Sequence, residues 1–580
     1  MKKKLVFGMA FLFGCSSISQ QPNWLARSNQ IAEEFTRSMS VLTPELGSSL
    51  GYKEFDVKGM NLTETSKQEE NEILQNWRER LIKEIEITKS EDLKVDLLIL
   101  LEKVENSLKW NEIDMQLGAI PFYAPSKSIY TMLLNLINDQ SPKKRKYDVV
   151  TRFKYYMSDA GKDNLIRAYQ KDIIRYQKKY SNKKTFYVFQ GELDKYLIES
   201  PSYIVGIKEL LSQSGRDDWQ NAYEIFVKET SSFDDFLKKE IRPKARKTPY
   251  IPKEVYVMIL KGVGVNSDPY EMIQIGKSEY KKKYNEFEIL ANTIAQKNNL
   301  KEKNPSSVIK FLKKKQVTSE KEVSDLYHLM TNRLEKIIID NKLVSLPSQK
   351  LKIRFAGDAE SKAKPVPHLV PPPIIDNNGI LPEFVVPTSS TGKLPFDDFS
   401  FESSATILSA HEGRPGHDLQ FSRMLEVPTS IIRARYAMNS VNVEGWALYA
   451  EDLVYPFLTD EEKLIALQAR LWRVARYFLD PMVNLEKISS DNITKIFHDE
   501  LGVSKEMSEL EYQRYAFRDP GQATAYYQGL LNIQELKNFL VGEYGEFNLK
   551  CFNDTLLSFG MMPHGLIKLF KEKFQKCSLR

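Results

Sequence analysis

The heptapeptide from His411 to His417 (HEGRPGH) constrains the fold of this chain more than any other stretch. Its two histidines are six positions apart, which on an ideal helix places them roughly 120° apart around the axis. Pro415 clashes with the carbonyl group of residue i−4, which is His411, and Gly416 permits dihedral angles that other residues avoid. We therefore expect the helix to end, kink or bulge after Arg414, and this break to bring His417 back towards His411.

The residue types in and after this stretch are those of a catalytic metal site. The chain has only six histidines, and two of them flank a glutamate here. Catalytic zinc usually takes three protein ligands from imidazole and carboxylate groups and leaves the fourth position to water. We expect His411, His417 and Glu444 to bind one zinc ion per chain, and Glu412 to act as the general base that takes a proton from the attacking water.

Two glutamates follow on one predicted helix, and only one of them is needed as the third metal ligand. Glu444 and Glu451 are seven positions apart and share a helix face. We assign Glu444 as the ligand, because the small Gly445 beside it allows close approach. Glu451 then bonds to one of the ligand histidines and orients it without touching the metal, with Asp452 as the alternative in that role.

The spacing of the histidines leaves a second interpretation open. The familiar zinc motif is H-E-x-x-H, with both histidines on one helix face, and that form is broken in this chain. The alternative is a buried helix whose two histidines are satisfied by hydrogen bonds. The helix downstream that bears Glu444 favours the metal site.

Three ordered motifs resemble a known family. They are H-E-x-x-P-G-H followed by Gln420, then E-G-W-A-x-Y-x-E from Glu444 to Glu451, then P-G-Q-A-x-A-Y from Pro520 to Tyr526. Together they resemble the bacterial domain-of-unknown-function family 885, over roughly residues 240–570 and most strongly over 405–530. The resemblance implies a mostly α, helical zinc-peptidase-like architecture with a central cleft and a small β-sheet edge beside the metal helix.

The resemblance also implies further site residues. Tyr526 matches the family tyrosine, and its hydroxyl is the predicted donor to the developing oxyanion, although a packing role is the alternative. Arg514 joins it among the predicted catalytic residues because the two come from helices on either side of Pro520-Gly521. Gln420 joins Glu451 as a residue expected to support the metal ligands from behind. His498 and His564 are weaker candidates for the oxyanion donor.

This chain departs from the family pattern at two positions. The family usually has a second histidine directly after the first motif, where this chain has Asp418. It often has D-x-G-x-H where this chain has Asp480-Pro481-Met482-Val483-Asn484. The three predicted metal ligands are all present.

The N-terminus has the pattern of a secretory signal. Three lysines precede the short apolar run Leu5–Phe13, which is too short to span a bilayer as a helix. The run ends in Leu12-Phe13-Gly14-Cys15, which resembles a bacterial lipoprotein box. We expect residues 1–14 to be a signal peptide, Cys15 to be lipidated, and residues 15–22 to form a tether that anchors the protein in the cell envelope. If the cell is Gram-negative, Ser16 after the cysteine indicates the outer membrane.

The net charge limits the kinds of partner to expect, and the cysteine content limits the possible disulfides. The net charge of +6 falls to +3 once the three lysines of residues 1–14 are removed, which argues against nucleic acid as a partner. With 42% apolar residues in 580, disorder is excluded as the main state. Apart from Cys15 the chain has only Cys551 and Cys577, which form one disulfide or stay free.

Helical periodicity runs through most of the chain. We expect an N-terminal helical scaffold over residues 23–240 and a catalytic half over 241–580. The predicted helix starts include the capping boxes Ser66-x-x-Glu69 and Thr459-x-x-Glu462. Between residues 351 and 395 prolines exclude a central strand, and residues 384–387 are the predicted edge strand. His368 lies in this region, and a surface or core position is the alternative to a place in the site.

The sequence therefore predicts an exported, lipid-anchored, zinc-dependent metallohydrolase that cleaves short peptides. One alternative is a binding lipoprotein that keeps a relic or structural metal site, although a structural site has no use for the base Glu412. Another is a metallohydrolase that acts on a different amide or ester.

Overall fold

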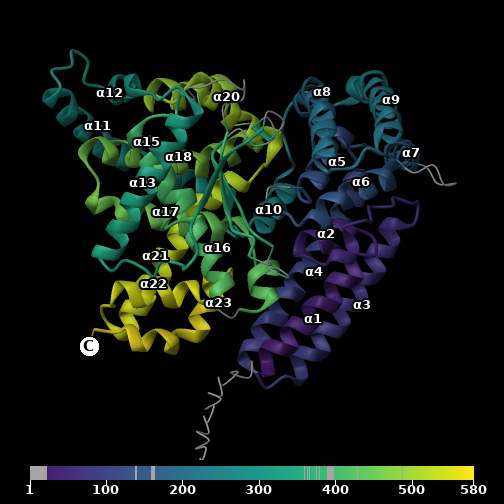
Figure 1. Ribbon diagram of the computed structural model, residues 1–580, viewed down its shortest axis with the longest axis horizontal. Helices are drawn as coiled ribbons and strands as arrows, with labels where there is room; N and C mark the ends of the chain where they lie inside the picture. Colours follow the sequence, from purple (N-terminus) through teal and green to yellow (C-terminus); the bar gives the residue numbers. More distant parts are fainter. Residues whose placement is uncertain are drawn as a thin grey trace, which may run out of the picture.

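The computed structural model describes residues 23–579, except 138–139, 158–163, 358–359, 362–363, 365, 374, 376, 378, 388–396, 428 and 486. The fold is mostly helical with a small sheet, as expected (Figure 1). The predicted signal peptide, the lipidated Cys15 and the tether lie outside the described residues. No described helix is both long and apolar enough to cross a membrane.

Helices make up the first part of the chain. Their bounds are α1 (Asn23–Met39), α2 (Pro44–Leu50), η1 (Lys53–Phe55), α3 (Ser66–Ile87), α4 (Glu91–Leu117), α5 (Pro125–Leu134), α6 (Lys143–Met157), α7 (Leu165–Lys179), α8 (Gln190–Gln213), α9 (Gln220–Phe236), η2 (Leu237–Ile241) and η3 (Arg242–Lys244).

The second part carries the sheet and the predicted site. Before and within the sheet region lie α10 (Lys253–Gly262), α11 (Pro269–Lys297), α12 (Pro305–Leu312), η4 (Lys313–Lys315), α13 (Glu320–Asp340), β1 (Lys352–Phe355), β2 (His368–Val370) and β3 (Glu383–Val386). After it lie α15 (Glu402–Leu408), η5 (Ser409–Gly413), α16 (His417–Glu426), η6 (Ile432–Tyr436), α17 (Ser440–Val454), η7 (Tyr455–Phe457), α18 (Asp460–Asn484), α19 (Ser490–Thr494), η8 (Lys495–Glu500), α20 (Lys505–Gln513), η9 (Arg514–Arg518), η10 (Gln522–Thr524), α21 (Ala525–Tyr544), α22 (Leu549–Leu557), α23 (His564–Ile567) and η11 (Lys568–Cys577).

One of the two predicted capping boxes forms and the other does not. At α18 the Thr459 hydroxyl accepts from the amide of Glu462, whose carboxylate accepts in return from the Thr459 amide. The box predicted at Ser66 is wrong. Ser66 is already the first residue of α3, and its hydroxyl accepts from the amide of Thr63 instead.

The predicted edge strand is the central strand of the sheet, so this expectation is wrong. The strand order is β1-β3-β2, with β3 parallel to β1 and antiparallel to β2. The prolines that argued against a central strand, Pro382 and Pro387, stand just outside β3, so all four of its residues keep an amide hydrogen. The edge that packs against η5 is β2, which contains His368.

Apolar packing joins the first helices to the last ones. One buried core contains side chains of α1, α3 and α4 together with side chains of α17, α21 and α22. A second core is built around α11 and α18, and a third lies within residues 120–245. Helices α17 and α21 pack closely against each other, and α17 also contacts η5. The domain boundary at residue 240 stays a prediction.

Candidate metal centre

The helix that carries His411 ends where the proline-glycine pair begins. After α15 the chain continues as the π-helix η5, which ends at Gly413; Arg414 is extended (φ −119°), and α16 begins at His417. A Cβ atom at Gly416 would lie 1.8 Å from the carbonyl oxygen of His411, so only glycine allows the chain to fold back this tightly. The break therefore brings the two histidines together.

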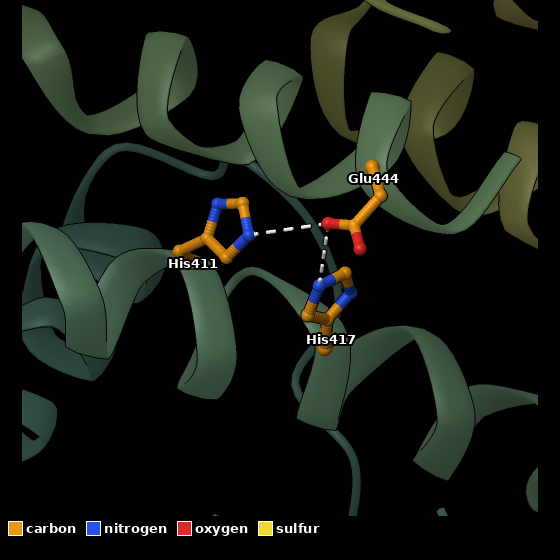
Figure 2. Close-up of side chains that lie close together, drawn as sticks. All are labelled: His411, His417 and Glu444. Carbon is orange, nitrogen blue, oxygen red and sulfur yellow. Dashed lines mark ion pairs between the residues drawn. The ribbon is translucent and has the colours of Figure 1, made fainter. Parts of the chain in front are cut away.

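His411, His417 and Glu444 meet at one point (Figure 2). Oε2 of Glu444 lies 3.4 Å from Nε2 of His411 and 3.4 Å from Nε2 of His417. One potential ligand atom from each residue lies within 4.8 Å of the others. The three side chains come from η5, from the start of α16 and from α17, so the arrangement depends on the break between η5 and α16.

The two separations from Oε2 of Glu444 match those expected around a zinc ion. Tetrahedral ligands at bond lengths of about 2.0–2.1 Å are separated by about 3.3–3.4 Å. Oε2 of Glu444 is buried and has no hydrogen-bond partner among the described residues, although a buried carboxylate oxygen is normally paired. A cation between the three groups would satisfy it.

Glu451 fixes the orientation of His411. Its Oε1 lies 2.7 Å from Nδ1 of His411, which leaves Nε2 free to face Glu444. Arg473 lies 3.6 Å from the same Oε1. Burial would raise the pKa of Glu451, but the charge of Arg473 and the bond to His411 lower it. Asp452, the alternative in this role, pairs with Arg470 at 2.7 Å instead.

Glu412 lies beside the ligands and is buried. Its Oε1 is 4.0 Å from Nε2 of His411, and the residue is only 8% exposed. Burial raises the pKa of Glu412, and the histidines His417 and His411 oppose this shift. A carboxyl group with a raised pKa is suited to take up a proton and release it again.

Tyr526 and Arg514 border the same site. The ring of Tyr526 stacks against that of His411, with centroids 6.1 Å apart and planes at 12°. Arg514 donates to the Tyr526 hydroxyl oxygen at 3.0 Å and also to the side chain of Gln522. Gln522 in turn places its amide nitrogen 3.4 Å from Oε1 of Glu444.

Sequence reasoning gave no role to Gln522, and it left two roles open for Arg473, which were binding of a substrate carboxylate and a place in a structural ion-pair ladder. Gln522 is the third residue of the P-G-Q motif, so its place in that motif was the available signal. Its side chain connects Glu444, a predicted metal ligand, with Arg514. Nothing in the sequence around Arg473 indicated that this arginine approaches Glu451.

The two positions that depart from the family pattern make structural contacts. Asp418 is fully buried and accepts from Nε of Arg414 at 2.7 Å. Asn484 donates to Asp480, which also accepts from the amide of Gly521 at 2.9 Å. Gly521 has φ +78°, a backbone conformation that favours glycine. The bond from its amide to Asp480 holds the turn that precedes Gln522.

Other predicted residues lie outside the cluster of ligand atoms. Gln420 donates to the carbonyl oxygen of Asn442 at 3.3 Å, two positions before Glu444. His498 is bonded through Nδ1 to the carbonyl oxygen of Val503, and His368 to that of Val366. His564 is buried in α23.

A family model matches almost the whole chain. The family described as "Bacterial protein of unknown function (DUF885)" matches residues 44–568. The chain belongs to this DUF885 family. The match begins nearly two hundred residues before the region in which the motifs indicated a resemblance, so the family includes the helices from α2 onwards. No curated protein is significantly similar to this chain.

Two solved structures share this fold. One is described as "a putative lipoprotein of unknown function from Shewanella oneidensis"; at 17% identity and a TM-score of 0.71 it covers 94% of this chain and 99% of its own. The other, "the putative lipoprotein from Colwellia psychrerythraea", has 16% identity and a TM-score of 0.69, and covers 95% of this chain and 99% of its own. At this identity the likeness extends to the fold alone.

Proposed function

We propose that this DUF885 protein is a zinc-dependent metallohydrolase that cleaves peptide bonds in short peptides. The observation that carries the proposal is the pair of 3.4 Å separations between Oε2 of Glu444 and the two imidazole Nε2 atoms, with Glu412 beside them. A structural zinc site usually has four protein ligands, whereas three ligands leave a position open for reactants.

His411, His417 and Glu444 would hold the zinc ion, which when bound supplies Lewis-acid chemistry for water and a carbonyl group. Glu412 takes the proton of the attacking water and later delivers it to the leaving amine. The Tyr526 hydroxyl, which accepts from Arg514, donates to the carbonyl oxygen as negative charge develops on it. Glu451 keeps His411 in the tautomer that presents Nε2.

The sheet edge supports an extended peptide as substrate. β2 lies next to η5 and pairs with β3 on one side only, so its other side is available among the described strands. An extended peptide can bind such an edge as an added strand. The proposal includes a helical zinc-peptidase-like architecture, with a central cleft between the first helices and the catalytic half.

The proposed location is the bacterial cell envelope. Its supports are the lipoprotein box at Cys15, the charged and apolar run before it, and the two similar structures described as lipoproteins. The disulfide between Cys551 and Cys577 agrees with an oxidising compartment.

Peptide cleavage by the wild type and by Glu412→Gln, both zinc-loaded, tests the proposal. We expect a roughly 10²–10⁴-fold loss of activity in the variant with unchanged zinc content, because the amide cannot take a proton. The matched control is Glu402→Gln at the exposed start of α15, which should retain activity. Equal inactivity of wild type and variant across a broad peptide library would contradict the proposal and favour a binding lipoprotein.

A further inference from the structure

A pocket with a volume of about 340 Å³ lies apart from the candidate metal centre and is lined by residues of α4, the start of α17, α21 and α23. It contains none of the ligand atoms of the candidate metal centre. Five asparagines are among its lining residues, which are Asn106, Asn266, Asn439, Asn442 and Asn532. The side-chain amides of Asn439 and Asn442 already donate to backbone carbonyl oxygens. The volume lies at the lower end of the range for small-molecule sites, which begins at about 300 Å³.

A cation that lines this pocket and a second cation near it have no ion-pair partner among the described residues. Lys103 lines it, and Arg435 lies on η6, which packs against α4. Neither side chain has a hydrogen bond or ion pair with any residue that the structure describes. Burial lowers the pKa of Lys103, and the charge of Arg435 lowers it further while Glu102 opposes the shift. Burial also lowers the pKa of Arg435. Two desolvated like charges are unfavourable unless an anion joins them.

His564 supplies a third unsatisfied group. It lines the pocket and is only 8% exposed, yet its Nδ1 has no hydrogen-bond partner within the described part of the chain. Burial lowers its pKa to about 4, so the ring is neutral at pH 7. A buried polar atom without a partner is unfavourable, and a polar ligand that bonds to it removes this cost.

We propose that this pocket binds a small polar molecule that carries an oxyanion group, either a carboxylate or a phosphate. Lys103 pairs with the oxyanion, and Arg435 strengthens the attraction. His564 and the side-chain amides of Asn106, Asn266 and Asn532 form hydrogen bonds with the rest of the ligand. Among the other charged residues that line the pocket, Glu535 is already paired with Lys568 at 2.6 Å. Glu102 is exposed and offsets the lowered pKa of Lys103 only in part, while Lys261 adds a further positive charge.

Calorimetric titration of the zinc-loaded mature protein with inorganic phosphate and, separately, with succinate tests this proposal. We expect saturable binding of at least one of the two and no binding of uncharged glycerol. Phosphate alone would identify a phosphate ester as the ligand class, and succinate alone a carboxylate. Absence of saturable binding by both anions would overturn the proposal.

Two substitutions place the binding at this pocket. Lys103→Met and Arg435→Met should each weaken it at least tenfold. Lys144→Met, which removes a lysine whose side chain is 79% exposed on α6, should leave it unchanged. Because each substitution removes a desolvated charge, we expect both variants to fold with an unfolding temperature at or above that of the wild type. Binding that survives both substitutions, as it would for an anion on the zinc ion, would overturn the assignment.

Discussion

At the residue scale, the candidate metal ligands follow from chemistry that can be recognised in the sequence. His411, His417 and Glu444 were chosen for their donor atoms and for a break in the helix, and the structure brings all three together. The contacts that orient them were harder to foresee. Arg473 and Gln522 reach Glu451 and Glu444 from other helices, and no local pattern encodes such a contact.

Replacing Glu451 by glutamine should weaken zinc binding by about 10–100-fold, because His411 loses the carboxylate that fixes its tautomer and raises its basicity. Competition with a chelator of known zinc affinity measures this change. Asp452→Asn is the matched control, since Asp452 is on the same helix but pairs with Arg470. A zinc affinity in Glu451→Gln equal to that of the control would show that Glu451 has no part in holding the ion.

At the element scale, capping residues predicted helix starts well where the side chain was free to cap, as at Thr459. They gave a wrong prediction of a capping box at Ser66, whose hydroxyl oxygen accepts from the amide of Thr63. The prolines beside β3 led to the wrong prediction of an edge strand, because the order of strands depends on pairing between distant segments.

The small Gly445 was expected to let Glu444 approach the metal, but Gly445 itself lies against α21. A Cβ at Gly445 would lie 2.6 Å from backbone atoms of Gly529.

Substituting Gly529 by alanine should therefore force α21 away from α17. A Cβ there would meet the carbonyl oxygen of Val441 at 2.1 Å. We expect a loss of about 1–3 kcal/mol in unfolding free energy, together with weaker zinc binding, because α17 carries Glu444. Urea unfolding and zinc titration measure the two effects.

The control for this substitution is Gly542→Ala on the same helix, where an added Cβ meets no atom within 4 Å. It should stabilise the protein by about 0.5–1 kcal/mol, because alanine favours the helix more than glycine does. If the two variants were equally stable, the close contact between α17 and α21 would be disproved.

At the scale of the whole molecule, the sequence predicted a mostly helical fold with a small sheet, because amphipathic periodicity is a local property. It did not predict that α1, α3 and α4 share a core with α17, α21 and α22. That packing joins segments some four hundred residues apart, and only their apolar faces are visible in the sequence. The family match from residue 44 onwards agrees with a structure in which the first helices belong to the same core.

The buried His564 makes the stability of the fold depend on pH. Its pKa is lowered to about 4 in the folded protein, from 6.5 in the unfolded chain, because burial disfavours the charged ring. Between these values the unfolded chain binds more protons, so stability is full above pH 6.5 and falls towards pH 4, by up to about 3 kcal/mol.

Urea unfolding of the wild type and of His564→Asn at a series of pH values measures this contribution. The variant should lose less unfolding free energy than the wild type between pH 6.5 and pH 4. Parallel pH profiles for the two proteins would mean that His564 is not buried in its neutral form.

The central claim is that His411, His417 and Glu444 hold one zinc ion. Anomalous X-ray diffraction at the zinc absorption edge, from crystals of the zinc-loaded protein, tests it most directly. We predict one strong anomalous peak per chain, within about 2.0–2.2 Å of the two imidazole nitrogens and the Glu444 carboxylate. A map without a peak between these three side chains, or with its peak elsewhere on the molecule, would contradict the claim.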